Sequence, residues 1–509
     1  MKKVILLFVI ALASFNLFGQ NAGDSIFNTG QLIHEIRISF STNAWLDTLK
    51  QYYAVGNQLD SNIYLMATSV QFDGVSYDSV GCKFKGNSSY NNSSDKKSWK
   101  LDFEEFKSNN EIDGLKQLNL NNGFKDPTLL REKICLDFLR YYGLPAPRAD
   151  YANVYVNNQL WGFYVLVEEV DKAFVKTHFG NKGGNLFKGD PHGDLRWKGA
   201  NPTLYYADYE LKTNEDVNDW SDLLWLLDNI NNTPAGQLYR DSLNASFNVS
   251  SFIKSWATTS LFVNLDSYTG SGHNYYVYHN TDSNRFEWIN WDVNEAFGVF
   301  VNGIPTNQLE TLPMSYVPSP QTNRPLTMKL TQDSIYWNEF QNFVCNALSD
   351  YFNPTNMGYI IDSLHNRIKT DAYADPRKFF PNNQFDSNID TDMGNTFGLK
   401  PFVQARYDYL TQQLDSFNCT PLASGIQQAA VVPLLRVYPN PSSSAFTIES
   451  SQRISDIELL DLEGRSVYQM PCNGLTKAEV NVLSLSAGTY FYLVQTVEGS
   501  RGRGKLIKQ

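Results

Sequence analysis

The sequence predicts an α+β protein, in which a large mixed domain is followed by a small C-terminal all-β sandwich. Three observations lead to this prediction. The chain has 509 residues, enough for about two to four domains, and its hydrophobic content of 42% is sufficient to build their cores. Segments with helix signals and segments with strand composition alternate up to residue 418. Beyond residue 435 only short strands separated by turn residues remain.

The first 20 residues have the layout of a secretory signal peptide. Lys2 and Lys3 precede an apolar run, from Val4 to Ala13, that is too short to span a bilayer. No later stretch approaches about twenty apolar residues, so we expect export without a transmembrane anchor. The net charge of −11 argues against nucleic acid as the main partner.

Residues 21–75 are predicted to form the N-terminal strands and helix of the main domain, which continues over residues 76–418. Two strands then flank the loop from Gly86 to Ser94, and Lys100 lies on the second of them. This loop is rich in Gly, Asn and Ser, and its backbone N–H groups can surround a phosphate group as a nest does. Ser88 is therefore a candidate phosphate-binding residue, although the same composition suits an ordinary hairpin loop.

A helix is predicted after Asp126, which caps it, and before Gly143, which ends it. It follows the strand that carries Lys100. Arg131 and Glu132, near the start of the helix, are both candidates to meet Lys100 or a bound phosphate. They lie about 100° apart on the helix, so only one of them is expected to face the site.

A second hairpin is predicted from the strand composition of Tyr151–Val156 and Leu160–Val167. Three acidic residues follow at the end of its second strand. Glu168 is a candidate binding residue at this position. For Glu169 and Asp171 a solvated acidic strand end is the better interpretation.

The most informative segment is a third hairpin. Tyr275–Tyr278 and Phe286–Trp291 have strand composition, and the polar residues between them form a turn about Asp282–Ser283. With that turn, Tyr275 faces Asn290.

The same pairing places Asn274 opposite Trp291, and Asp292 follows immediately. Directly opposed residues are about 4.5–5.5 Å apart between Cα atoms, so the side-chain oxygens of Asn274 and Asp292 can converge on one point. Such oxygens suit a hard divalent cation, Mg²⁺ or Mn²⁺, that also binds water and phosphate. Asp266, in the loop before the hairpin, is left to face a substrate hydroxyl group. Asp and Asn at strand ends are also common turn formers, which is the competing interpretation.

Protein kinases use the same order of a loop Asp, a metal-binding Asn and a short hairpin that ends in a metal-binding Asp. Five motifs in order, between about residues 75 and 415, resemble those of the CotH family of atypical kinases, which is named for a spore-coat protein. The motifs are Phe84–Ser89 with Lys97–Phe103, Leu118–Asn122 with Asp126–Arg131, Tyr155–Asn158, Trp161–Tyr164 with Glu168-Glu169, and the hairpin ending in Trp291-Asp292.

The resemblance implies an atypical protein-kinase-like two-lobed domain over residues 76–418. It implies that Asp266 is the catalytic residue, and that Asn274 and Asp292 bind the metal ion. Asp266 and Asn274 are eight residues apart, against about five in typical kinases, so the loop between them is expected to bulge outwards.

The residues expected to bind ATP or its phosphates are Lys100, Arg131, Ser88 and Glu168. Glu168 ends the strand where kinase-like folds connect their two lobes and contact adenine. The family resemblance favours Arg131 and the general kinase analogy favours Glu132. We prefer Arg131.

A linker is predicted over residues 419–435 and the β-sandwich over residues 436–509, with its first strands at Phe446–Glu449 and Ile454–Leu460. The motifs Val437–Pro441, Asp461–Gly464, Leu485–Tyr490 and Lys505–Lys508 resemble a type IX secretion C-terminal sorting domain. Such domains occur in Bacteroidetes-type bacteria and direct cargo across the outer membrane. The resemblance therefore implies the type IX secretion machinery as a partner and a secreted or cell-surface location. The alternative is a carbohydrate-binding sandwich. It does not explain why the motif Val437–Pro441 at the start of the domain occurs together with Lys505–Lys508 at its end.

Together these features predict an exported atypical kinase that transfers the γ-phosphate of ATP to a protein hydroxyl group, with Mg²⁺ or Mn²⁺. The acceptor is expected to be an unknown protein at the cell surface. Two alternatives stay open: a kinase-like adhesion or structural protein without catalysis, and a nucleotidyl transferase on the same scaffold.

Overall fold

A computed structural model of the chain describes residues 21–27, 33–59, 61–418, 435–461, 465–497 and 501–509. The predicted signal peptide, and the predicted linker apart from its last residue, lie outside the described residues. None of the helices in the described ranges combines the length and the apolar character that crossing a bilayer requires.

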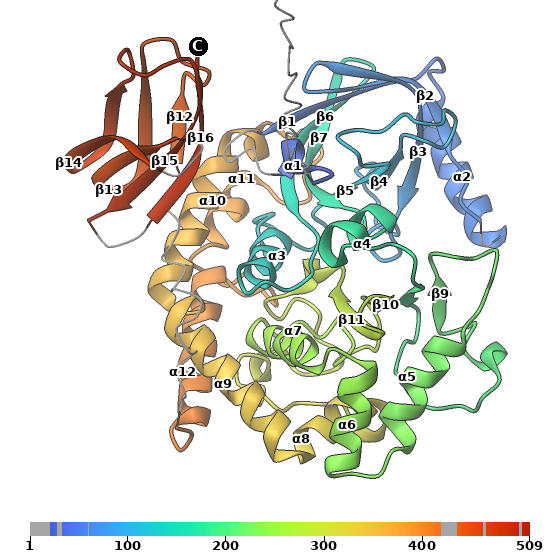
Figure 1. The fold of residues 1–509 in the computed structure, drawn as a ribbon. Helices are drawn as coiled ribbons and strands as arrows, with labels where there is room; N and C mark the ends of the chain where they lie inside the picture. The colour runs from blue at the N-terminus through green and yellow to red at the C-terminus, as the bar shows by residue number, and fades with distance from the viewer. Residues whose placement is uncertain (1–20, 28–32, 60, 419–434, 462–464, 498–500) are drawn as a thin grey trace, which may run out of the picture.

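The N-terminal part of the structure is a closed barrel of seven strands, in the order β1-β2-β3-β4-β5-β7-β6 (Figure 1). All neighbours are antiparallel except β1 and β6, whose parallel pairing closes the barrel. Residues 34–72, which supply β1 and β2, are thus integral to the barrel. The strands are β1 (His34–Ser39), β2 (Leu65–Phe72), β3 (Val75–Lys85), β4 (Ser98–Asp102), β5 (Gln117–Asn121), β6 (Ala149–Val156) and β7 (Gln159–Glu168).

The alternation of side chains along β3, β4 and β5 separates an apolar interior from a polar outer row. Successive residues of a strand point to opposite faces, so the apolar residues between the polar ones fill the barrel core. The register aligns Lys83, Lys100 and Asn119 across the three strands. Lys85, two residues after Lys83, and Asn121, two residues after Asn119, extend this row.

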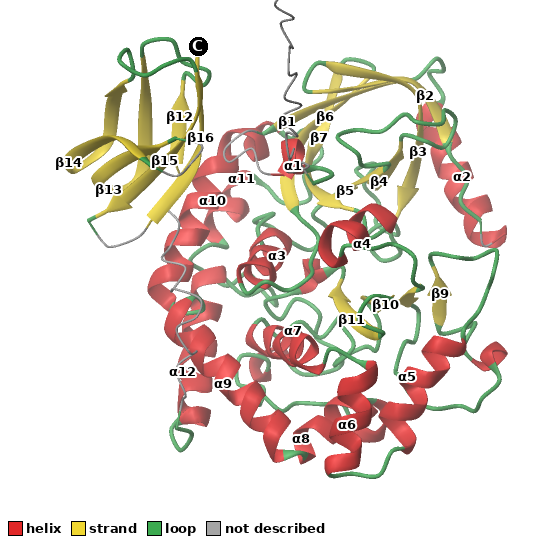
Figure 2. Cartoon of the chain, viewed as in Figure 1, coloured by secondary structure: helices red, strands yellow, loops and turns green. Residues whose placement is uncertain are grey.

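Helices and a four-stranded sheet, ordered β11-β10-β8-β9, make up the rest of the main domain (Figure 2). The sheet consists of β8 (Leu186–Gly189), β9 (Tyr209–Leu211), β10 (Tyr275–Asn280) and β11 (Arg285–Asn290). The helices are α1 (Asp24–Phe27), α2 (Trp45–Leu59), α3 (Arg131–Tyr141), α4 (Lys172–Phe179), α5 (Ser221–Asn232), α6 (Gln237–Ser246), α7 (Val249–Leu261), α8 (Pro325–Gln332), α9 (Ser334–Asp350), α10 (Pro354–Ala374), α11 (Asn382–Ser387) and α12 (Leu399–Leu414).

Helix α3 connects the two parts of the main domain. It packs against β6 of the barrel and against the short 3₁₀ turn Val293–Glu295, which directly follows Asp292. Its buried face includes Ile134, Leu136 and Leu139, as its apolar pattern predicted. The predicted start is wrong, because the helix begins at Arg131 and Asp126 is not its N-cap. The start of α3 therefore lies beside the end of the β10–β11 hairpin.

The C-terminal part is all-β, as predicted, and has its own apolar core. Its strands are β12 (Leu435–Tyr438), β13 (Ala445–Leu460), β14 (Ser466–Asn481), β15 (Gly488–Thr496) and β16 (Arg501–Lys508). The two strands expected at 446–449 and 454–460 form one long strand, β13. The hydrogen bonds join all five strands into one sheet, where the prediction was a sandwich of two. Register shifts between Glu449 and Asp456 mark the place where the two separate strands were expected.

Candidate functional site

The site is built at one end of the β10–β11 hairpin. Tyr275 lies opposite Asn290, which confirms the predicted register. The backbone N–H of Trp291 donates to the carbonyl oxygen of Asn274 at 3.2 Å. Asn274 and Asp292 both have a left-handed backbone, with φ of +61° and +51°, a conformation that Asn and Asp adopt more readily than most residues. The hairpin thus brings Asn274 and Asp292 to neighbouring strand ends.

Asp266 is held by residues of the loop that leads into the hairpin. The Asn274 side-chain amide donates to the backbone carbonyl oxygen of Asp266 at 3.0 Å. The Asp266 carboxylate oxygen Oδ1 lies 2.8 Å from Nε2 of His273 and accepts a hydrogen bond from Ser271 Oγ at 3.2 Å. The loop between Asp266 and Asn274 folds back on itself through backbone hydrogen bonds, from Ser271 to Leu265 and from Gly272 to Ser267. This compact turn takes up the additional residues and is largely buried, so the expected outward bulge is wrong.

Asp292 is a carboxylate with charged neighbours and no hydrogen-bond donor among the residues that the structure describes. Burial raises the pKa of Asp292, and the negative charge of Asp266 raises it further. The positive charges of Lys85, Lys188 and His273 act in the opposite direction. Asp292 is half-buried, and a partly desolvated carboxylate without donors is costly in the absence of a bound cation.

Lys85 reaches from the outer row of the barrel towards the hairpin. Its Nζ donates to Asn119 Oδ1 at 2.9 Å and lies 5.3 Å from the centre of the Trp291 ring. Burial lowers the pKa of Lys85, while the negative charges of Glu169 and Asp292 oppose that effect. Lys85 is therefore a cation placed between carboxylates from both parts of the domain.

Lys100, the lysine predicted to bind phosphate, forms an ion pair with Glu169 at 2.7 Å. Glu169 also accepts a hydrogen bond from Asn119 at 2.7 Å. Burial by itself raises the pKa of Glu169, but Lys100, Lys85 and Asn119 outweigh it and lower that pKa to about 2. The interpretation of Glu169 as a solvated strand end is wrong, because its side chain is buried against two lysines and the Asn119 amide.

Glu132, on α3, lies on the side of the helix that faces Asp292. Its two carboxylate oxygens accept hydrogen bonds from the Asn121 side chain at 2.8 and 3.0 Å. Burial and the negative charge of Asp292 raise the pKa of Glu132 to about 8, although Asn121 and Lys85 lower it. Glu132 therefore shares the electrostatic environment of Lys85 and Asp292.

Arg131, which we preferred to Glu132, points elsewhere. Its guanidinium group is completely buried and bonded to Asp126, to Asn388 Oδ1 at 2.8 Å and to the carbonyl oxygen of Phe397 at 2.7 Å. These contacts join the start of α3 to the segment after α11. Glu132, the next residue along the helix, faces the site instead. Adjacent helical residues point about 100° apart, so only one of the two candidates could do so.

Glu168 and Ser88 are also apart from the residues described above. Glu168 is buried and makes a two-oxygen ion pair with Arg148, at 2.9 and 2.5 Å. Glu169, one position later, turns to the opposite side, as the alternation along a strand requires. Ser88 lies exposed on the loop after β3.

We call the residues that surround the hairpin end the charged cluster. It consists of Lys85, Lys100, Glu132, Glu169, Asp266, His273 and Asp292. Sequence reasoning missed Lys85 and His273. The signal for Lys85 was available, because it lies two residues from Lys83 and so on the same face of β3, and it is part of the motif at Phe84. The pairing of His273 with Asp266 had no signal beyond proximity in sequence.

The donor set at the hairpin end fits Mg²⁺ or Mn²⁺. Such ions are commonly bound by one or two carboxylates together with phosphate and water, without a cage made entirely of protein. Asp292 offers a carboxylate without a donor from the described residues, and Asn274, opposite Trp291 at the neighbouring strand end, offers an amide oxygen. Over the described ranges, no group of three or more His, Cys, Asp or Glu residues is arranged to hold a metal by itself. The site therefore suits a cation that a phosphate group helps to bind.

Comparison with known proteins matches two parts of the chain to family models. Residues 82–410 match the model of the CotH kinase protein family, and residues 436–509 match that of a secretion system C-terminal sorting domain. The chain is 25% identical over 323 residues to inner spore coat protein H of Bacillus subtilis (strain 168). The matched region covers 63% of this chain and 83% of that protein. The sorting domain indicates secretion or export to the cell surface.

Proposed function

Because this chain belongs to the CotH kinase protein family, we propose that it is an exported phosphotransferase that moves the γ-phosphoryl group of ATP to a hydroxyl group of a protein. In this proposal the barrel and the helical part are the two lobes of an atypical protein-kinase-like domain. The observation that supports it best is the pair of carboxylates at the hairpin end. Asp292 receives no hydrogen bond from the residues that the structure describes, and Asp266 is oriented by its own loop.

Asn274 and Asp292 would hold the Mg²⁺ or Mn²⁺ ion. When bound, the ion neutralises the negative charge of the ATP phosphates during transfer. The oxygens available there, one carboxylate and one amide, are hard ligands of the kind that such ions prefer.

Lys85 is the residue best situated to bind the phosphates, since its ammonium group interacts electrostatically with both Asp292 and Glu132. Lys100 contributes indirectly, through its ion pair with Glu169, which keeps the Glu169 carboxyl group ionised. The negative charge of Glu169 in turn holds the Lys85 ammonium group in place. This assignment replaces direct phosphate binding by Lys100 as the main expectation. For Arg131 and Glu168, buried ion pairs with Asp126 and Arg148 favour a structural role.

Asp266 is the proposed catalytic base. The acceptor hydroxyl oxygen forms a bond to the γ-phosphorus, the bond from the γ-phosphorus to the β–γ bridging oxygen breaks, and ADP leaves. The hydroxyl proton passes to the Asp266 carboxylate. The placement of this carboxylate matters most for the task, because phosphoryl transfer depends mainly on position and on neutralised charge.

The sorting domain supports a partnership with the type IX secretion machinery, and the acceptor would then be a protein at the cell surface. Surface display is compatible with a kinase-like scaffold that only binds, so turnover must be measured directly.

The test uses purified protein with Mg²⁺ or Mn²⁺ and ATP labelled at either the γ- or the α-phosphate. Label transferred from the γ-position to a surface-protein fraction supports the proposal. Transfer from the α-position would instead identify a nucleotidyl transferase, and transfer from neither position would favour an adhesion or structural protein. Asp266→Ala is expected to retain Mg–ATP binding, measured by calorimetry, and to lose γ-transfer, since its interaction is made on the way to the transition state.

A further inference from the structure

The imidazole of His273 contacts the proposed catalytic carboxylate directly, with Nε2 2.8 Å from Asp266 Oδ1. The ring is only partly exposed, at 27% of its side-chain surface. We propose that His273 is a positioning residue, which donates a hydrogen bond to Oδ1 of Asp266 and so leaves Oδ2 to accept the proton of the acceptor hydroxyl group. This inference rests on the proposed function for the role of Asp266.

The distribution of donors around Asp266 supports this assignment. Oδ1 receives both side-chain contacts, from His273 and from Ser271, whereas the backbone carbonyl oxygen receives the Asn274 amide. Within the described part of the chain, no donor contacts Oδ2. Asn274 therefore holds the main chain of Asp266, and the carboxylate plane is set by His273 and Ser271. Of these two contacts the one to His273 is shorter by 0.4 Å, as the distances of 2.8 and 3.2 Å show.

The loop delivers His273 in a fixed orientation. Arg324 donates to the carbonyl oxygen of Gly270 at 2.5 Å and is packed so closely on Gly272 that a Cβ atom there would lie 2.9 Å from the guanidinium group. Gly272 has a φ of +88°, in the region that favours glycine. His273 follows this turn immediately, between the turn held by Arg324 and the strand β10. A side chain anchored on both sides loses little freedom on binding Asp266, which is what a positioning residue requires.

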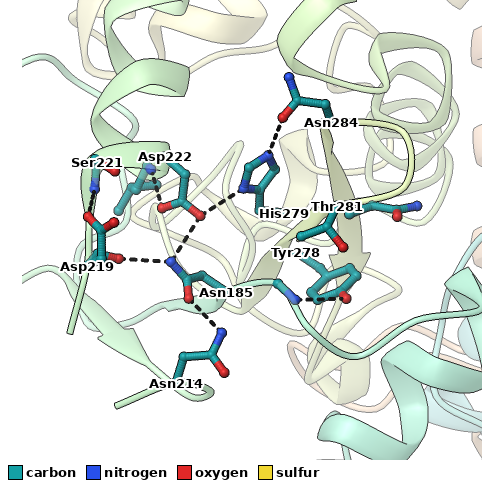
Figure 3. A network of polar contacts seen from close by, with 12 residues as sticks. Asn185, Asn214, Asp219, Ser221, Asp222, Tyr278, His279, Thr281 and Asn284 are labelled. Carbon is teal, nitrogen blue, oxygen red and sulfur yellow. Dashed lines mark hydrogen bonds and ion pairs between the residues drawn. The ribbon is translucent and has the colours of Figure 1, made fainter. Parts of the chain in front are cut away.

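Strand β10, which follows His273, carries a second histidine that pairs with an aspartate and provides a matched control (Figure 3). His279 lies with Nδ1 3.0 Å from Asp222 Oδ2 and Nε2 3.2 Å from Asn284 Oδ1. Asn185 also donates to Asp222 at 3.0 Å, so this network ties the turn end of the hairpin to the start of α5. The pair has the same chemistry as His273 and Asp266 but lies at the opposite end of β10, away from the charged cluster.

The test compares His273→Gln, His273→Leu and the control His279→Leu in the full secreted chain. Gln places an amide N–H near the position of Nε2 and keeps the donor, whereas Leu removes it. We expect kcat for γ-transfer to fall about 10- to 100-fold in His273→Leu with KM for ATP within about 2-fold, and to recover to within about 3-fold of wild type in His273→Gln. His279→Leu should keep kcat within about 2-fold. Equal kcat in the Leu variant and in wild type, or an equal loss in the Gln variant, would overturn the positioning role.

Crystal structures of the two His273 variants give a readout that does not depend on turnover. Asp266 should keep its rotamer in His273→Gln and leave it in His273→Leu. An unmoved Asp266 in His273→Leu would contradict the inference even if kcat fell. If the wild-type protein transferred no label from ATP, the proposed function would fail, and the rotamer of Asp266 would still decide whether His273 positions it.

Discussion

Replacing Asp292 with Asn is expected to stabilise the metal-free protein and to abolish its response to Mg²⁺. The carboxylate has no donor among the described residues and is repelled by two other carboxylates, Asp266 and Glu132, so its ionised form is disfavoured until a cation binds. Asn keeps the size and shape of the side chain and removes the charge. Sites prepared for a ligand commonly carry such a cost in stability.

The magnitude follows from the effect of Asp292 on Glu132. Raising the pKa of Glu132 from 4.5 to about 8 costs its ionised form about 5 kcal/mol in the folded state. Burial is the larger cause and Asp292 the next, so we assign about 1–2 kcal/mol to Asp292. A carboxyl group whose pKa is higher in the folded than in the unfolded state stabilises the fold at low pH. This stabilisation is lost as the pH rises through the folded-state pKa. The gain from Asp292→Asn should therefore be larger at pH 9, where Glu132 is ionised, than at pH 6.

The assay is thermal unfolding in EDTA and in Mg²⁺, at pH 6 and pH 9. For a domain of more than about 250 residues, 1 kcal/mol shifts Tm by about 1–2 °C, so a rise of about 2 °C is expected at pH 9 in EDTA. Mg²⁺ with a non-hydrolysable ATP analogue should raise the Tm of the wild type and leave that of Asp292→Asn unchanged. A lower Tm of Asp292→Asn than of the wild type in EDTA at pH 9 would contradict this prediction, because the carboxylate would then be a structural cap.

Asp375→Asn is the matched control for a buried aspartate with a structural role. Asp375 accepts hydrogen bonds from Lys96 Nζ at 2.6 Å and from the backbone of Phe163 and Arg377 at 3.1 and 2.8 Å. Removing its charge leaves the buried Lys96 ammonium group unpaired, which should destabilise the protein by about 3–5 kcal/mol. Opposite signs for the two substitutions would separate a ligand carboxylate from a structural one.

Three further predictions concern other parts of the chain. Glu169→Gln should lower the free energy of unfolding at pH 7 by about 3 kcal/mol, because the pKa of Glu169 is lower in the folded than in the unfolded state. The stabilisation is present above the unfolded-state pKa of about 4.5 and is lost as the pH falls towards 2, which urea titration at several pH values checks. Arg131→Met should cost about 3–5 kcal/mol by leaving Asp126 unpaired, and calorimetry should find the ATP affinity of the folded fraction unchanged. Truncation after residue 430 should leave a folded main domain that fractionation finds in the periplasm, because the C-terminal strands have their own core. Truncated protein at the cell surface would contradict the sorting role.

Much of the hairpin could be predicted because its signals are local. The turn residues between the two strands fix the register, and a period of two then assigns every partner, including the pair of Tyr275 and Asn290. The all-β C-terminal part was predictable for the same reason, although the merging of two expected strands into β13 was not. A register shift within a continuous strand leaves no clear signal in the sequence, since both halves keep strand composition.

Local patterns along the chain were enough to predict the order of the elements and the register of the hairpin that carries Asn274 and Asp292, and to identify the family motifs. The folded molecule was needed to show which of two adjacent residues faces the site: Glu132 and not Arg131, Glu169 and not Glu168. The physical reason is geometric. One residue turns a helical side chain by about 100° and a strand side chain by about 180°, so a small difference in how α3 and β7 dock exchanges the neighbours completely. The barrel likewise closes through the pairing of β1 with β6, segments more than a hundred residues apart, which no local pattern specifies.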